Sequence, residues 1–209
     1  MTDDQIQSVK DDIAFMRALA AEGQRTPLLG GAILVAAGLI FGAASLAYWA
    51  MLEEHLVVDP EWGSFFIWMG ALALFLIVLT VLNIRIGKQP GARSPANRAS
   101  GAAWMGVGMA IFAMGLSYGV AGWQLRSDDV MATFPSVIFA LYGAGWAVAA
   151  AMTGKRWLWW VAFGSWAMAP VLAWFSAISI QYILYAVALF LLMSLPGYVL
   201  TRGEPSDTV

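Results

Sequence analysis

The sequence has no cysteine and only one histidine, His55, which excludes several kinds of chemistry. Without cysteine there is no disulfide, no thiolate nucleophile and no thiolate metal ligand. One histidine cannot build a multi-histidine zinc site, and the HExxH sequence of metalloproteases is absent. We therefore expect no metal, no cofactor and no set of catalytic residues.

Charged residues are also scarce. They make up 11% of the 209 residues, against about 25% in an average soluble domain. Hydrophobic residues make up 61%, which is more apolar surface than a soluble chain of this length can bury, whereas lipid solvates such surface directly. The net charge of −2 gives no basis for nucleic-acid binding. The composition indicates an all-α, polytopic membrane protein.

Six stretches without a charged residue are long enough to cross a bilayer, whose apolar core of about 30 Å needs roughly 20 helical residues. The last two belong to one apolar run, which must break near residues 176–179 because a single helix of that length exceeds the bilayer. Pro170 is expected to kink the fifth span. Residues 1–27 form a separate segment, and 201–209 form a tail. The expected spans are Leu28–Leu52, Trp62–Ile84, Ser100–Trp123, Thr133–Met152, Trp157–Phe175 and Ser179–Leu200.

All 11 Lys and Arg residues except Arg126 lie on one side of these spans. Short loops rich in Lys and Arg stay in the cytoplasm, so both termini are expected there, in a bacterial inner membrane. Tryptophans agree with this topology, because amphipathic rings prefer the membrane interface. The acidic residues of the opposite loops are Glu53, Glu54, Asp59, Glu61, Asp128 and Asp129. The interfacial tryptophans are Trp49, Trp62, Trp123 and Trp174 outside, and Trp157, Trp159 and Trp160 inside.

Small residues recur along the first, third and fourth spans. In lipid the hydrophobic effect between helices is weak, and close approach through small residues supplies the contact. We expect these three spans to form the crowded centre, and the second and sixth to face lipid. The alternative is that the glycines line a substrate path. The glycines assigned to packing are Gly31, Gly38 and Gly42 in the first span, and Gly101, Gly108, Gly115, Gly119 and Gly122 in the third.

An amphipathic helix is expected over residues 3–22, ahead of the first span. Thr2 and Gln5 fit a capping box, and Gly23 is a typical helix stop. The apolar stripe can lie on the membrane, pack on the protein's own basic loop Arg85–Arg98, or bind a partner. Its net acidic polar face argues against anionic lipid. The stripe consists of Ile6, Val9, Ile13, Met16 and Ala20.

The spans contain no Asp, Glu, Lys, Arg or His, the groups that proton relays and ion-coupled transport need at membrane depth. Ser165 has no nearby base in the sequence and is interpreted as a packing serine. The outer loop around His55 has donors for a divalent cation, or is simply a solvated acidic loop. A set of large or polar side chains can form an apolar pocket for a lipid or a quinone-like molecule, or can be ordinary core. This set is Trp68, Trp104, Trp146, Trp166 and Gln181.

The sequence therefore favours a non-enzymatic membrane protein that acts as an interaction or regulatory module through its N-terminal helix. Its expected partners are membrane lipids and either a cytoplasmic protein or a second copy of the chain. The alternative is a small transporter or channel for an uncharged or apolar solute. An enzyme is the least favoured reading.

Overall fold

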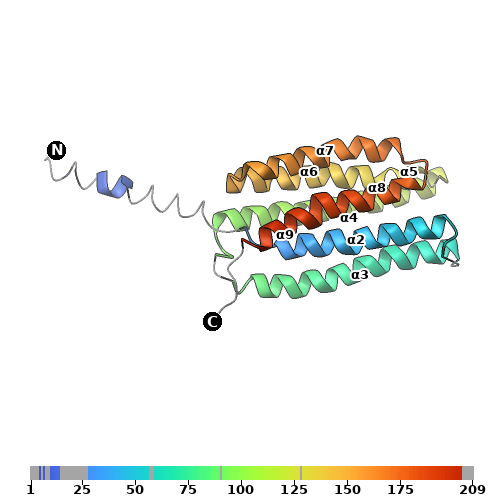
Figure 1. Cartoon of the computed structure of the whole chain (residues 1–209), viewed down its shortest axis with the longest axis horizontal. Helices are drawn as coiled ribbons and strands as arrows, with labels where there is room; N and C mark the ends of the chain where they lie inside the picture. The colour runs from blue at the N-terminus through green and yellow to red at the C-terminus, as the bar shows by residue number, and fades with distance from the viewer. Residues whose placement is uncertain are drawn as a thin grey trace.

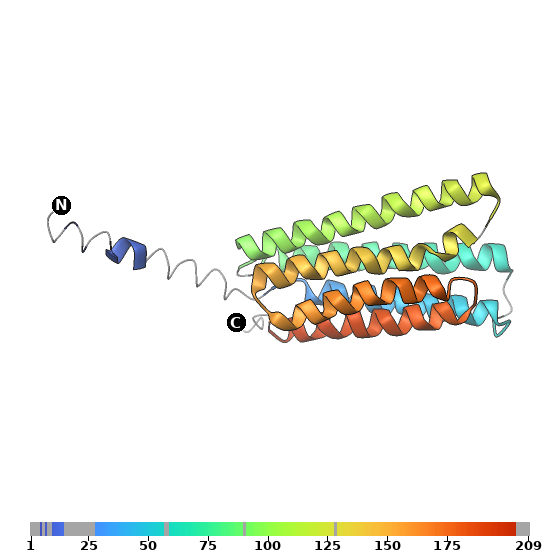
Figure 2. The ribbon, with the colours of Figure 1, turned by 90° about the horizontal axis from the view of Figure 1, so that it is seen from above.

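The structure is a computed structural model that describes residues 5, 7, 10–14, 28–56, 59–89, 91–127 and 129–203. Within these residues the chain is helical, without a β-strand. The helices run lengthwise side by side in one bundle (Figures 1 and 2). They are α2 (Gly31–Leu52), α3 (Pro60–Ile86), α4 (Pro95–Leu125), α5 (Asp129–Ala132), α6 (Phe134–Thr153), α7 (Arg156–Trp174), α8 (Ile180–Leu189), the π-helix η1 (Phe190–Ser194) and α9 (Leu195–Thr201).

Five helical segments in the described part are both long and apolar enough to cross a membrane. The remaining expected span corresponds to α7, which has 19 residues and lies along α6 (Figure 1). The chain is thus a helical membrane protein, as its composition predicts. The five segments are Gly31–Leu52, Trp62–Ile86, Pro95–Leu125, Asp129–Thr153 and Ile180–Thr201.

Local sequence explains where several helices begin and end. α4 starts five residues before the expected span, because the Ser94 hydroxyl accepts a hydrogen bond from the Asn97 N–H and Pro95 occupies the first turn. Between α6 and α7 the chain turns at Gly154, whose φ of 66° requires the left-handed conformation. α7 continues through Pro170 to Trp174, and α8 begins at Ile180, so the last apolar run breaks where expected.

The helices form two packed groups. α3 packs along α2, and α2 packs along α8, η1 and α9, which together make one continuous rod, here called the final helix (residues 180–201). In the second group α6 packs along α7 on one side and α4 on the other. α7 joins the groups by contacting α8 and η1. Consequently α2, α6 and the final helix are central, while α3 and α4 are peripheral.

The core lies between α6, α7 and the final helix. Large side chains from all three are fully buried there, among them Trp146, Phe139, Leu158, Leu172 and Leu189. Phe139 and Tyr185 meet edge to face with ring centroids 5.7 Å apart, which links α6 to the final helix. The interior of the bundle is therefore filled by side chains from several helices.

α2 and the final helix approach each other closely enough for their backbones to touch. A Cβ built on Gly31 would lie 2.5 Å from the Gly197 carbonyl oxygen, and one on Gly197 would lie 2.7 Å from that of Gly31. At Gly38 it would collide with the Ser194 hydroxyl and lie 2.9 Å from the Leu189 carbonyl oxygen. Only glycine permits such backbone contact, so Gly31 and Gly38 lie where α2 and the final helix meet.

Two expectations about the centre of the bundle are wrong. The sixth span is central, because Gly197 and Ser194 allow α2 to approach it closely. The third span is peripheral, because α4 packs along α6 and α5 and leans away from the bundle toward its Leu125 end (Figure 2). A Cβ on Gly101, Gly108 or Gly119 would meet no atom within 4 Å. Gly115 faces the Phe134 ring, and Gly122 faces the Ser127 carbonyl of its own C-terminal turn.

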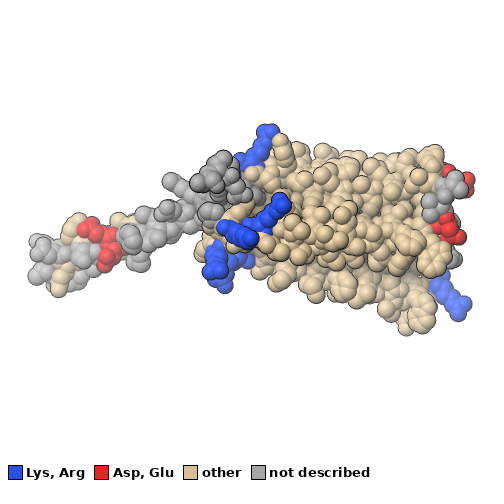
Figure 3. Space-filling model, turned by 90° about the horizontal axis from the view of Figure 1, so that it is seen from below, with Lys and Arg blue, Asp and Glu red and all other residues tan. Residues whose placement is uncertain are grey.

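Charge separates the two ends of the bundle (Figure 3). At one end, here called the basic end, lie Arg85, Lys88, Arg93, Arg98, Lys155, Arg156 and Arg202. At the other end, the acidic end, the described part of the chain places Glu53, Glu54, Asp59 and Asp129, together with Arg126. This separation matches the charge bias read from the sequence.

We expect Gly38→Leu to prevent folding or to lower thermal stability in detergent strongly. The added side chain would separate two touching backbones, and overpacking typically costs about 1–3 kcal/mol, with larger losses where backbones are in contact. Gly108→Leu is the matched control, since it inserts the same side chain at an open position on α4. Folded yield and melting temperature in detergent measure both. Equal loss from the two variants would contradict the assignment of α2 as the central contact.

Candidate functional site

The described polar side chains inside the bundle mostly donate to backbone carbonyls, and two of them connect α2 to the final helix. The Ser45 hydroxyl donates to the Tyr182 carbonyl oxygen at 2.8 Å. Further along, the Ser194 hydroxyl donates to the Val35 carbonyl oxygen at 3.3 Å. Glycine allows the two helices to approach closely, and these hydrogen bonds fix how they are aligned. Ser45 continues the seven-residue spacing of Gly31 and Gly38, a pattern visible in the sequence, whereas no such pattern marks Ser194.

Trp146 of α6 donates to a carbonyl of the final helix whose donor in a regular α-helix would be residue 196, which is a proline. Its indole N–H donates to the Leu192 carbonyl oxygen at 3.0 Å. Four residues after Leu192 stands Pro196, which has no N–H to give, and whose ring crowds that carbonyl in a regular helix. Just before this proline, the π-helix η1 forms a turn that is wider than an α-helical turn. The Trp146 indole N–H thus bonds to the carbonyl that Pro196 cannot serve, and this bond joins α6 to the final helix.

Gln181 performs a similar role at the acidic end. It is fully buried, and its amide nitrogen donates to the Ala132 carbonyl oxygen at 2.6 Å and to that of Leu172 at 3.3 Å. Both carbonyls belong to the last turns of helices, where backbone acceptors lack intrahelical donors. The amide oxygen Oε1 has no hydrogen-bond partner. Gln181 therefore ties the ends of α5 and α7 to the final helix.

The five residues proposed to form an apolar pocket do not line one space. Trp104 and Trp146 are neighbours, with ring centroids 5.2 Å apart. Trp166 lies over Gly143 of α6 and donates from its indole nitrogen to the Ala140 carbonyl oxygen at 3.1 Å. Trp68 belongs to α3 and packs against Tyr48 of α2, with centroids 5.8 Å apart. These rings, and Gln181 described above, fill separate contacts between helices.

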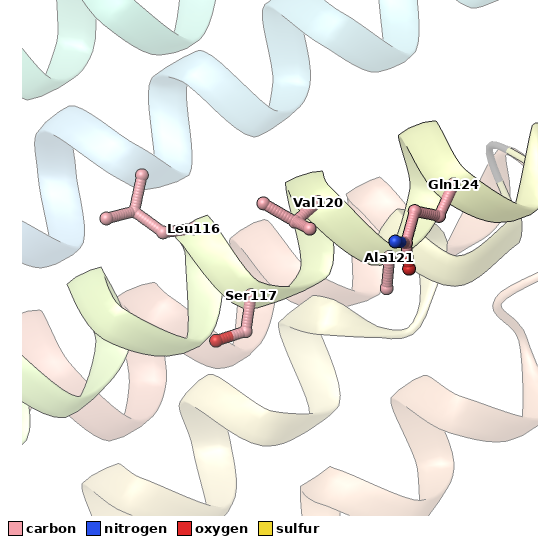
Figure 4. Close-up of a pocket in the computed structure, with 5 residues that line it drawn as sticks. All are labelled: Leu116, Ser117, Val120, Ala121 and Gln124. Atoms are coloured by element: carbon pink, nitrogen blue, oxygen red, sulfur yellow. The ribbon is translucent and has the colours of Figure 1, made fainter.

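A shallow hollow of about 390 Å³ lies on the surface of α4 (Figure 4). A second one, of about 350 Å³, lies on α3. Each is lined by residues of a single helix, so neither encloses a ligand between helices. The residues of the first are Leu116, Ser117, Val120, Ala121 and Gln124, and those of the second are Leu76, Ile77, Thr80 and Val81.

The described part of the N-terminal segment is helical at Gln5, Gln7 and residues 10–14, and these residues are exposed. Gln7 donates to the Asp11 carboxylate at 3.2 Å, a bond between neighbours on one helical face. Of the expected apolar stripe, Ile13 is 40% exposed. The other stripe residues, Ile6, Val9, Met16 and Ala20, lie outside the described residues.

Candidate catalytic and metal-binding groups are already engaged or dispersed. Ser165 is fully buried, and its hydroxyl donates to the Val161 carbonyl oxygen of its own helix at 2.8 Å. Near the acidic end the Ser179 hydroxyl donates to the Glu53 carboxylate at 2.5 Å. The His55 ring packs against Trp49, with centroids 5.6 Å apart. Within the described residues, no three His, Cys, Asp or Glu side chains gather as a metal site would require.

Comparison with known proteins found no match among protein-family models, curated proteins or solved structures.

We expect Trp146→Phe to destabilise the protein by about 1–3 kcal/mol, because it removes the indole donor from the part-buried Leu192 carbonyl. Pro196→Ala restores a backbone N–H four residues after Leu192. In the Pro196→Ala background, Trp146→Phe should therefore cost less. Melting temperatures of the wild type, the two single variants and the double variant measure this coupling. Equal costs in both backgrounds would show that Trp146 acts through ring packing alone.

Proposed function

We propose that this chain is a non-enzymatic integral membrane protein that acts as an interaction or regulatory module. Support comes from how its polar groups are used. Four buried or partly buried side chains donate to a backbone carbonyl of another helix, namely those of Gln181, Trp146, Ser45 and Ser194. Ser165 donates within its own helix. Such bonds hold a scaffold together, and they do not present groups to a substrate.

The filled interior argues against the alternative of a transporter or channel. A path for a solute needs space that crosses the bundle, yet Trp146, Phe139 and Leu189 are fully buried between the central helices. The two surface hollows described above lie on the peripheral helices α3 and α4. We therefore place the recognition surface of the proposed module outside the bundle core.

In this proposal the N-terminal helix, residues 3–22, is the docking element. The observation that carries it is the exposure of Ile13 on a helical segment that also exposes Asp11 and Asp12. An exposed apolar stripe beside acidic residues favours a protein partner with a basic rim over an anionic lipid surface. The partner is a cytoplasmic protein or a second copy of this chain, since two copies of such a stripe can form a short coiled coil.

The proposed topology is six spans in a bacterial inner membrane, with α7 as the fifth span and both termini in the cytoplasm. Its support is the concentration of Lys and Arg at the basic end of the bundle. With an even number of spans, the N-terminal helix and the tail lie on the same side. The docking element then faces the cytoplasm.

Topology reporters test this arrangement. Fusions after Arg98 and after Arg202 are expected to show cytoplasmic activity, and a fusion after Glu61 to show external activity. The reason is that each lies in, or next to, a loop whose charge fixes its side. An external Arg202 fusion with a cytoplasmic Arg98 fusion would leave α7 unable to act as a separate span.

Ile13→Asp is expected to leave membrane insertion unchanged and to abolish a specific protein contact, because it places a charge in the apolar stripe. Ala14→Asp is the control, since it adds the same charge about 100° around the helix. A cysteine at Gln7 in the otherwise cysteine-free chain reports the contact by crosslinking in native membranes. Crosslinks only to lipid, or only to the chain's own Arg85–Arg98 loop, would refute the docking role.

A further inference from the structure

The surface of α7 carries a continuous wall of aromatic rings that starts next to the basic end. Trp159 and Trp160 each contact Phe163, with ring centroids 6.0 and 6.5 Å apart, and Phe163 contacts Trp166 at 5.8 Å. The steps of three and four residues place the rings on one helix face. From Trp159 to Trp166 the wall extends about 10 Å along the helix axis, at 1.5 Å per residue.

This wall faces outward, and its end farther from the basic end is held in place by Trp166. Trp160 is 78% exposed and Phe163 is 53% exposed, so the rings lie on the outer surface of the bundle. Trp166 is fixed by its hydrogen bond to the Ala140 carbonyl oxygen and by its seat over Gly143. A surface whose rings are ordered beforehand loses little entropy when a flexible chain packs on it.

Positive charge stands where the wall begins. Lys155 and Arg156 precede the aromatic residues by a few positions, and the first turn of α7 contains no acidic residue. Within residues 28–203 the described acidic side chains lie at the acidic end, so no described carboxylate neutralises this pair. A cation pair next to an apolar wall is complementary to a lipid with an anionic headgroup and acyl chains.

We propose that α7 binds an anionic phospholipid of the surrounding bilayer. Lys155 and Arg156 hold its phosphate, and its acyl chains lie on the wall formed by Trp159, Trp160, Phe163 and Trp166. This site rests on the proposal that α7 spans the membrane. It does not depend on the docking role of the N-terminal helix. It differs from a general attraction of anionic lipid to the basic end, because the cations elsewhere at that end lack such a wall on their own helix.

The test is a titration of purified wild-type protein in detergent with phosphatidylglycerol, followed by native mass spectrometry of the bound lipid. Phosphatidylcholine with the same acyl chains is the neutral-headgroup comparison. We expect preferential binding of phosphatidylglycerol. The double variant Lys155→Gln with Arg156→Gln should weaken it roughly thirty-fold, the size expected for two cations near an anionic surface. The matched control, Arg85→Gln with Lys88→Gln, removes two cations from the end of α3 and should leave this binding unchanged.

A second pair of variants tests the wall. Phe163→Ala should weaken binding of phosphatidylglycerol, whereas Phe112→Ala, at an exposed ring on α4, should not. Equal loss from the two cation pairs would overturn the proposal in favour of diffuse attraction to the whole basic end. It would also be overturned by equal affinity for the two lipids, or by Phe163→Ala binding as the wild type does. None of these three results affects the crosslinking test of the N-terminal helix, so the two proposals fail independently.

Discussion

The backbone contact between α2 and the final helix is the constraint on which the bundle depends. Lipid is as apolar as the helix surfaces, so two helices gain from meeting only if their atoms pack closely. Gly31 against Gly197 and Gly38 against Ser194 allow that approach, and the Ser194 hydroxyl bonds to α2 across it. Because α3 packs on α2, and α7 packs on α8 and η1, the position of this pair sets the position of both packed groups.

Around that contact, buried polar groups repair defects in the helical backbone. Pro196 removes a donor from the final helix, and Trp146 of α6 replaces it. The carbonyls at the ends of α5 and α7 lack donors, and Gln181 of the final helix supplies both. An unsatisfied carbonyl in an apolar medium costs several kcal/mol, so each repair also fixes which helix lies beside which.

A bundle held in this way engages its interior polar groups in helix contacts, so the interaction role proposed above is assigned to its surface and its ends. The core is filled by rings and aliphatic side chains, whereas large exposed apolar side chains lie on α3, α4 and α7, and most described Lys and Arg side chains gather at the basic end. This distribution supports the proposed role as an interaction module.

The sequence by itself determined the class of the protein, the extent of most helices and the separation of charge between the two ends. These properties follow from local composition, because apolar length and Lys and Arg in short loops act without reference to the rest of the fold. The glycines of the first span were also recognisable, but those of the third had the same spacing and proved to be open. Whether a glycine packs against another helix depends on the residues opposite it. Only the tertiary structure places Ser194 and Gly197 of the final helix opposite the glycines of α2. The donors from Trp146 and Gln181 were hidden for the same reason, since their acceptors lie 46 and 49 or 9 residues away and come within reach only through helix packing.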